Sequence, residues 1–172
     1  MITIYMGKSA SGKDYFLKKA VKAGANPIVS FTTRPMRDGE KDGSDYHFVT
    51  GERFMELVKE GAFTEYRSYK TNYHGVEDTW YYGSPLVDPT KNHVVVLDPD
   101  GVKSYIRTYG AKNLQIHYVR ANDEVRTKRA MKRGGFDMSE WTRRLKADEE
   151  AFSDDVINDI AGKASVTVID NE

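Results

Sequence analysis

A glycine-rich loop near the N-terminus limits the possible folds of this chain more than any other feature. The spacing Gly-x-x-x-x-Gly-Lys runs from Gly7 to Lys13, directly after the short apolar run 2–6 and directly before a helical pattern. Glycines allow a tight turn in which successive backbone N–H groups point inward, and a helix N-terminus favours an anion. This order of strand, loop and helix predicts a phosphate-binding loop.

The loop supplies the candidate residues for a donor nucleotide. They are Gly7, Ser9, Ala10, Ser11, Gly12, Lys13 and Asp14. The Lys13 ammonium is expected to reach the β- and γ-phosphates of ATP and to act in catalysis. Asp14 stands where such loops usually carry the Ser or Thr that binds Mg²⁺, and a carboxylate also suits that ion. A helix cap is the alternative role for Asp14.

Alternating strand and helix patterns predict the fold class. Short apolar runs predict strands at 2–6, 27–31, 94–97, 114–119 and 166–169. Helical spacing predicts helices at 13–23, 51–61, 102–109, 123–133 and 139–152. Asp123 and Ser139 are the expected caps of the last two. The pattern predicts an α/β fold, in which helices flank a mostly parallel P-loop sheet.

One segment differs in amino-acid composition from the rest of the chain. Residues 34–92 are rich in aromatic side chains, glycine and charge. We therefore predict a single domain with a core at 1–33 and 93–172, and an inserted lobe at 34–92.

Composition narrows the choice of partners. Among 172 residues, Lys plus Arg and Asp plus Glu both number 26, so bulk charge gives no support for a nucleic-acid or membrane-surface partner. The absence of Cys excludes disulfides and a cysteine nucleophile. No apolar run approaches the roughly 18 residues of a membrane helix, and no secretory signal is recognisable, so a cytoplasmic protein is expected.

Two arginines predict a second phosphate site. Arg34 and Arg37 lie three residues apart, and their guanidinium groups can grip the dianionic phosphate of a nucleoside monophosphate with forked hydrogen bonds. Tyr46 can add a hydroxyl group. The alternative interpretation is two solvated surface arginines and a packed tyrosine.

The surrounding residues resemble a known family. The run Ser30-Phe-Thr-Thr-Arg-Pro-Met-Arg-Asp-Gly-Glu40, followed by Asp-Gly and by Asp-Tyr-His-Phe48, closely resembles guanylate kinases, and the resemblance covers nearly the whole chain. It implies phosphoryl transfer from Mg-ATP to GMP or dGMP. It also implies that Ser30 and Glu65 contact guanine, whose N–H donors suit a carboxylate.

A short Tyr-Tyr-Gly-Ser motif of that family has two candidates here. The segment 72–75 lies nearer the usual distance, whereas Tyr82 to Ser84 matches the residues better. We choose Tyr82 and Ser84, because Ser84 supplies a hydroxyl group for the base. This choice implies an extra loop at roughly 69–79.

The resemblance also implies residues for the metal and the moving phosphoryl group. Asp98 ends an apolar strand and matches an acidic residue that addresses Mg²⁺ and the acceptor, with helix capping as the alternative. A lid at about 129–144 would bring Arg129, Arg133 and Arg144 onto the phosphates. Asn171 is the candidate for holding adenine.

Two other functions remain open at this point. Guanylate kinase-like domains of scaffold proteins bind phosphopeptides and do little chemistry, but the complete loop of Gly7, Gly12 and Lys13 argues against this role. A kinase with a different monophosphate acceptor is the other alternative. Glu65 favours guanine.

Overall fold

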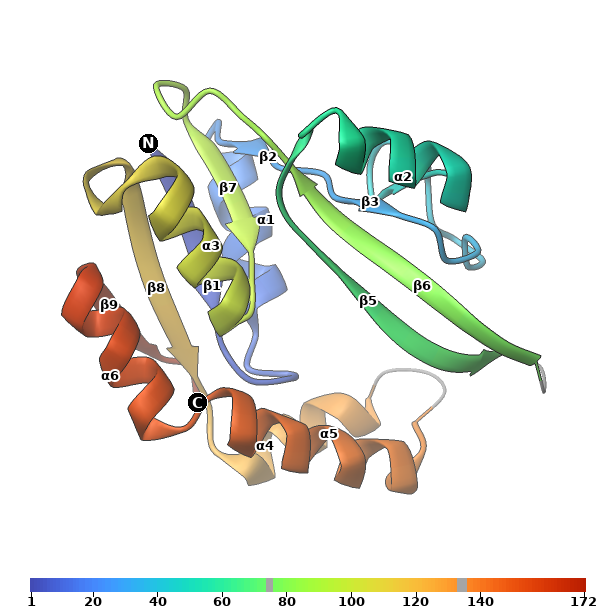
Figure 1. Ribbon diagram of the computed structural model, residues 1–172. Coiled ribbons are helices and arrows are strands. Elements are labelled where there is room, and N and C mark those ends of the chain that lie inside the picture. Colours follow the sequence, from blue (N-terminus) through green and yellow to red (C-terminus); the bar gives the residue numbers. More distant parts are fainter. Residues whose placement is uncertain (74–75, 133–135) are drawn as a thin grey trace. The chain divides into compact units, whose positions relative to one another are not determined.

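The structure, a computed structural model, describes residues 1–73, 76–132 and 136–172 (Figure 1). Its contacts divide the chain into two units, which are described separately: Met1–Pro27 with Pro89–Glu172, and Ile28–Asp88. The bounds 34–92 of the inserted lobe stay a prediction from the sequence.

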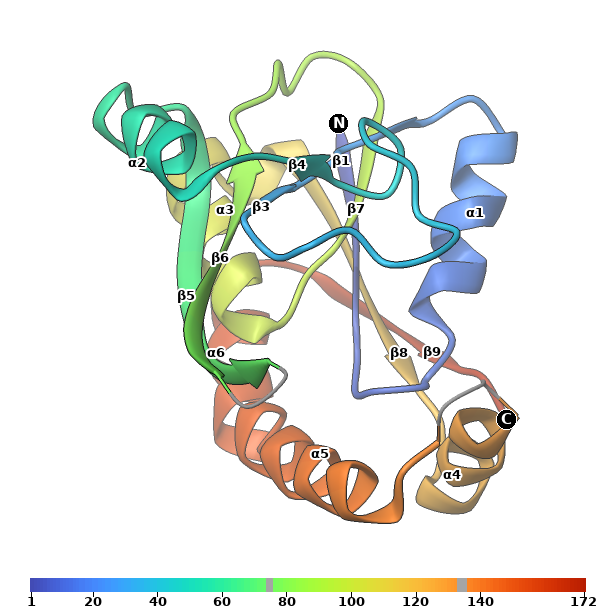
Figure 2. The same ribbon diagram turned by 90° about the vertical axis from the view of Figure 1, so that its right-hand side faces the viewer.

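The first unit contains a sheet in the order β2-β7-β1-β8-β9, with every pair of neighbours parallel. The strands are β1 (Ile2–Met6), β2 (Asn26–Pro27), β7 (His93–Val96), β8 (Leu114–Arg120) and β9 (Val166–Asp170). The helices are α1 (Lys13–Lys22), α3 (Pro99–Tyr109), α4 (Asp123–Met131), α5 (Met138–Ala151) and α6 (Asp154–Lys163), with a short 3-10 helix at Ala111–Asn113. Helix α1 covers one face of the sheet, and α3 and α6 cover the other (Figures 1 and 2). The predicted α/β class is confirmed.

Strand β1 lies at the centre of this sheet. Its side chains alternate between buried and half-buried, and Ile4 pairs with Val95 on one side and Ile116 on the other. Tyr105 of α3 and Ile160 of α6 are also fully buried. Burial of such side chains supplies most of the stability of a fold, so the loop after β1 leaves from a firmly held strand.

The second unit contains a sheet in the order β4-β3-β6-β5. Its strands are β3 (Phe31–Thr32), β4 (His47–Phe48), β5 (Phe63–Tyr73) and β6 (Val76–Pro85), and its helix is α2 (Gly51–Lys59). Helix α2 buries Phe54 and Leu57, and the Phe54 ring stacks on Phe63 with centroids 4.8 Å apart. This unit therefore has a small apolar core of its own.

Three local predictions were wrong. Residues 27–31 do not form one strand: β2 pairs with β7 in the first unit, whereas β3 pairs with β4 and β6 in the second. Asn122 and Asp137, not Asp123 and Ser139, cap α4 and α5, since their side chains accept hydrogen bonds from the amides of Val125 and Glu140. Asp123 instead pairs with Arg126 one turn further along.

The expected extra loop at 69–79 is also wrong, because most of it continues a hairpin. Strands β5 and β6 pair antiparallel from Glu65↔Ser84 outward to Tyr73↔Val76. The segment is rich in Tyr, Thr, Val and Trp, which fit a pleated strand well. Helix α6 has no counterpart among the predicted elements. None of the helices that the structure describes is long and apolar enough to cross a membrane.

Candidate functional site

The loop between β1 and α1 is tightly turned. Gly12 has a φ of 101°, in the left-handed region that glycine adopts without steric cost. A Cβ atom at Gly7 would lie 2.2 Å from the Val119 carbonyl oxygen, and one at Gly12 would lie 2.2 Å from Asn171 Nδ2. Ala10 has a φ of 58°, which costs a residue other than glycine about 1 kcal/mol or more. Surrounding contacts must therefore hold the loop in this conformation.

Lys13 begins α1 and turns its ammonium group back over the loop. Its Nζ donates hydrogen bonds to the carbonyl oxygens of Gly7, at 2.6 Å, and Lys8, at 2.9 Å. The cation therefore lies at the loop that the sequence assigns to the donor phosphates.

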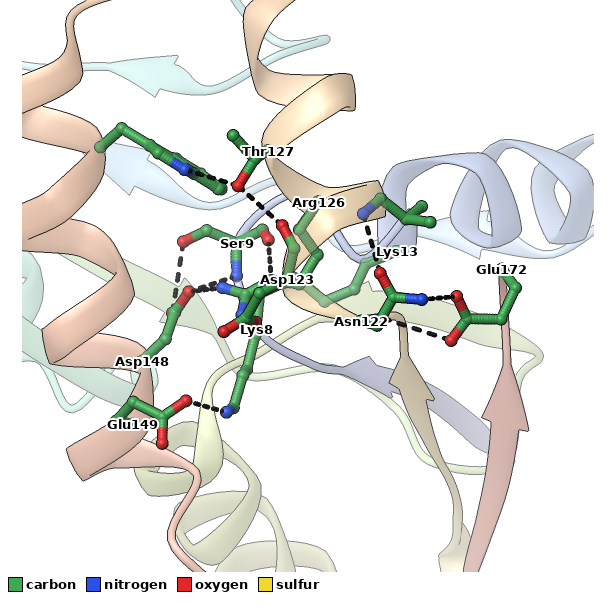
Figure 3. A network of polar contacts seen from close by, with 12 residues as sticks. Lys8, Ser9, Lys13, Asn122, Asp123, Arg126, Thr127, Asp148, Glu149 and Glu172 are labelled. Carbon is green, nitrogen blue, oxygen red and sulfur yellow. Dashed lines mark hydrogen bonds and ion pairs between the residues drawn. The ribbon is translucent and has the colours of Figure 1, made fainter.

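Two helices, α4 and α5, bind the loop at Ser9 (Figure 3). Arg126 of α4 donates from Nε to the Ser9 carbonyl oxygen at 2.8 Å. Asp148 of α5 accepts hydrogen bonds from the Ser9 amide at 2.8 Å and the Ser9 hydroxyl group at 3.2 Å. Arg126 NH2 also pairs with Asp148. We call these contacts among Ser9, Arg126 and Asp148 the Ser9 clasp.

The predicted lid arginines lie in different surroundings. Arg129 reaches the loop, since its NH1 donates to the Ser11 carbonyl oxygen at 3.2 Å. Arg144 is half-exposed and donates from Nε to Glu140 on its own helix at 2.8 Å. Hydrogen bonds from Arg143 and Arg144 lower the pKa of Glu140 to about 2. The prediction for Arg133 lies outside the described residues.

The two candidate metal ligands are single carboxylates at helix starts. Asp14 lies in the first turn of α1, and Asp98 caps α3 by accepting from the Gly101 amide at 2.9 Å. In the described part of the chain, no three His, Cys, Asp or Glu side chains gather as a metal site. Mg²⁺ in kinases commonly takes one or two carboxylates together with water and substrate phosphates, and the carboxylate groups of Asp14 and Asp98 are of the chemical type that this ion binds.

Asn171, the adenine candidate, contacts the loop. Its Nδ2 donates to the Ser11 carbonyl oxygen at 2.8 Å, and its backbone amide donates to the Arg120 carbonyl oxygen at 2.8 Å. In this structure its amide group supports the loop next to Gly12.

In the second unit, Arg34 is buried and its charge is paired. Its NH1 and NH2 groups donate to the two carboxylate oxygens of Glu40 at 2.8 and 2.6 Å. The guanidinium lies over the rings of Tyr46 and Phe48, 5.1 and 5.5 Å from their centroids. The Arg34 side chain and the Arg37 amide, in that order, lower the pKa of Glu40 to about 2. The guanidinium group of Arg34, for which the sequence predicts a phosphate partner, thus binds the carboxylate of Glu40 in this structure.

Arg37 and Tyr46 differ in exposure. Arg37 is exposed, and no residue that the structure describes bonds to or pairs with its guanidinium. Tyr46 is half-buried, and burial is the main cause that raises the pKa of its phenol group. The Tyr46 ring meets the Tyr82 ring edge to face, with centroids 6.0 Å apart.

The pairing of β5 with β6 brings the predicted base contacts together. Glu65 is the register partner of Ser84, and Arg67 is the register partner of Tyr82. Because alternate residues of a strand share a face, these four side chains belong to one face of the hairpin. Arg67 donates from Nε and NH2 to Glu65 Oε2 at 3.3 and 3.0 Å, and Ser84 is fully buried.

The other candidates for the base are placed less tightly. The Ser30 carbonyl oxygen accepts from the His47 amide at 2.9 Å, which ties Ser30 to β4. Of the alternative motif at 72–75, residues 72 and 73 belong to the last part of β5, and residues 74 and 75 are outside the described range.

Sequence reasoning missed four residues that orient the candidates. In the sequence, Glu40 stands out only as part of the motif, and Arg67, Arg126 and Asp148 do not stand out. The spacing of Arg67 two residues after Glu65, on one face of a strand, was a usable signal. Arg126 and Asp148 gave none, because their partners lie 117 and 139 residues away in Ser9.

The fold places the chain in a structural class. A solved guanylate kinase from Anaplasma phagocytophilum superposes with a TM-score of 0.64 at 20% identity, covering 100% of this chain and 77% of that one. At this identity the likeness shows the fold alone: a mixed α/β architecture with a parallel sheet flanked by helices.

A family model described as Guanylate kinase matches residues 2–155, so the chain belongs to the guanylate kinase family. The chain is 44% identical over 75 residues to the guanylate kinase of Schizosaccharomyces pombe, covering 42% of this chain and 37% of that protein. It is 28% identical over 174 residues to that of Bdellovibrio bacteriovorus, covering 94% of this chain and 90% of that protein. The first of these relatives is thus matched over less than half of its length.

Proposed function

We propose that this chain is a guanylate kinase that transfers the γ-phosphoryl group of ATP to GMP or dGMP. An oxygen of the acceptor phosphate forms the new P–O bond, the bond from the γ-phosphorus to the β–γ bridging oxygen breaks, and that oxygen leaves with the electron pair as part of ADP. No covalent intermediate with the protein is needed, because positioning and electrostatic stabilisation carry such reactions.

The donor half of the proposal rests on the loop and Lys13. Backbone amides of the loop and the Lys13 ammonium would hold the donor phosphates, so Lys13 would exchange its contacts with Gly7 and Lys8 for phosphate oxygens. A Mg²⁺ ion bound with ATP would neutralise charge on the β- and γ-phosphate oxygens, and we assign Asp14 and Asp98 to it. Arg129, Arg133 and Arg144, in a lid at about 129–144, would stabilise charge on the transferred group.

The acceptor half rests on a lobe assigned to 34–92, where Arg34, Arg37 and Tyr46 would hold the acceptor phosphate. The single observation that carries guanine as the base is the register of Glu65 opposite Ser84. A carboxylate accepts from the N1–H and N2–H groups of guanine, and a hydroxyl group beside it can bond the same edge. Arg67 supports this role, because it fixes the Glu65 carboxylate and keeps its charge paired.

The test is a coupled ADP-release assay with Mg-ATP and GMP, dGMP, AMP, CMP, UMP or buffer alone. Release with the guanine nucleotides only is the expected result. Release with other acceptors would favour a kinase of different acceptor, and no release from folded protein would favour a binding module.

Arg37→Ala tests the acceptor phosphate site in the same assay. We expect kcat/KM for GMP to fall on the order of 100-fold or more, because an exposed guanidinium assigned to a dianion is lost. Arg53→Ala is the matched control, since Arg53 is an exposed arginine of the same unit that pairs with Glu56. Near-normal turnover of Arg37→Ala would remove Arg37 from the site.

A further inference from the structure

Arg126 is a buried cation to which the proposed reaction gives no role. Its side chain is 0% exposed, although it belongs to the charged helix α4. Burying a guanidinium is costly unless every donor finds a partner. The contacts of this side chain therefore show what its position serves.

Each nitrogen atom of the Arg126 guanidinium group has a partner. NH1 pairs with Asp123 at 2.6 Å, NH2 pairs with Asp148, and Nε donates to the Ser9 carbonyl oxygen at 2.8 Å. The guanidinium also lies 5.8 Å from the centroid of the Trp141 ring. One cation thus joins two helices to the phosphate loop.

Asp148 completes the attachment of Ser9. Its Oδ2 atom accepts from the Ser9 amide and its Oδ1 atom from the Ser9 hydroxyl group. The amide, carbonyl and hydroxyl groups of Ser9 are therefore all held by α4 and α5, as Figure 3 shows. The side chain of Asp148 is only 13% exposed, so water competes weakly for these bonds.

The residue after Ser9 explains why the loop needs this support. Ala10 has a φ of 58°, a conformation that persists only where the surrounding structure imposes it. A phosphate cradle made of backbone amides binds well when its shape is set beforehand, because no binding energy is then spent on ordering it.

We infer that Arg126 and Asp148 are positioning residues that hold the phosphate loop in its nucleotide-binding conformation through Ser9. The inference rests on the proposed function in one respect, namely that this loop takes ATP. Arg129 follows Arg126 by one turn and Arg144 precedes Asp148 by one turn, so the clasp lies within one helical turn of two arginines that the proposed function uses.

The test compares variants that keep the fold but lose the clasp. Arg126→Met/Asp148→Leu removes both charges together, and such replacement of a buried pair is often neutral for stability. Glu149→Gln is the matched control on the same helix, because the Lys8–Glu149 pair is partly exposed. The measurements are thermal unfolding, the dissociation constant of Mg-ATP by calorimetry, KM for ATP and for GMP, and hydrogen exchange of the Ser9 amide.

We expect the double variant to stay folded, to bind Mg-ATP on the order of tenfold to 100-fold more weakly, and to exchange the Ser9 amide faster. KM for GMP should stay unchanged. A merely structural role would not weaken the binding of Mg-ATP while leaving KM for GMP unchanged. A folded double variant that binds Mg-ATP as tightly as the unaltered protein would overturn the inference. If the double variant does not fold, Asp148→Asn keeps the volume, and an unchanged dissociation constant there would overturn it equally.

These measurements distinguish a failure of this inference from a failure of the proposed function. ATP binding without transfer to GMP would contradict the proposed function and leave this inference intact. If the unaltered protein does not bind Mg-ATP, both are wrong.

Discussion

The two units of this molecule use a buried arginine in different ways. In the first unit, Arg126 joins residues that are far apart in sequence, since Ser9 is 117 positions away and Asp148 is 22 positions away. In the second unit, Arg34 bonds Glu40 only six positions away and the carbonyl oxygen of the adjacent Pro35. The first arrangement connects three segments of the fold, whereas the second shapes one loop.

This difference bears on what each arginine can do. Arg126 is enclosed, with partners on each side, so it can position a loop but cannot leave to meet a substrate. Arg34 lies beside an exposed Arg37 in a loop, and its partner Glu40 is 20% exposed. A phosphate that binds there could replace Glu40 as the partner of the fork without unfolding the unit. The comparison therefore separates an enclosed structural tie from a paired cation that we propose as a binding group.

The largest expected effect is the loss of Arg126 alone. In Arg126→Met the Asp148 carboxylate keeps its charge without its cation, and breaking one partner of a buried pair costs about 3–5 kcal/mol. Urea unfolding of the variant and the unaltered protein measures this free energy. A cost below about 1 kcal/mol would show that the long-range tie stabilises little and would break the comparison.

Arg34→Met should cost less, about 2 kcal/mol, because Glu40 lies nearer to water and can be solvated again. KM for GMP should rise as well, since the variant lacks one guanidinium assigned to the acceptor phosphate. The same unfolding experiment, together with GMP kinetics, checks both effects. Equal losses for the two arginines would contradict the distinction drawn between them.

A last expected effect concerns pH. The pKa of Glu40 is lowered from 4.5 to about 2 in the folded protein, so its contribution to stability is complete above pH 4.5 and is lost as pH falls toward 2. Glu40→Gln should therefore flatten the dependence of the unfolding free energy on pH in this window. Unfolding midpoints measured from pH 7 down to the acid limit would show it, and identical slopes in both proteins would exclude the Arg34–Glu40 pair as their cause.

The same contrast explains how much could be predicted from the sequence. Strand β1, the loop and α1 follow from local rules, because glycine spacing and apolar periodicity act over a few residues. The Arg34 region lies in one contiguous motif. The Ser9 clasp could not be predicted, since nothing near Arg126 or Asp148 in sequence indicates that folding brings both to Ser9.

The errors have local physical causes. The run 27–31 is apolar enough for a strand, but the chain passes from one sheet to the other within it. The predicted caps of α4 and α5 lie one and two residues after the observed ones, because several adjacent residues can cap a helix and only geometry selects among them. The family pattern predicts a loop beyond Tyr69, but the residues there favour strands and continue the hairpin.

The proposed phosphoryl transfer is measured most directly by following the phosphorus atom itself. The protein is incubated with Mg²⁺, GMP and ATP labelled on the γ-phosphate, and the labelled products are separated. The proposed phosphoryl transfer predicts that the label appears in GDP in amounts equal to the ADP formed. Label that is released as inorganic phosphate, or that stays on ATP while folded protein is present, would contradict it.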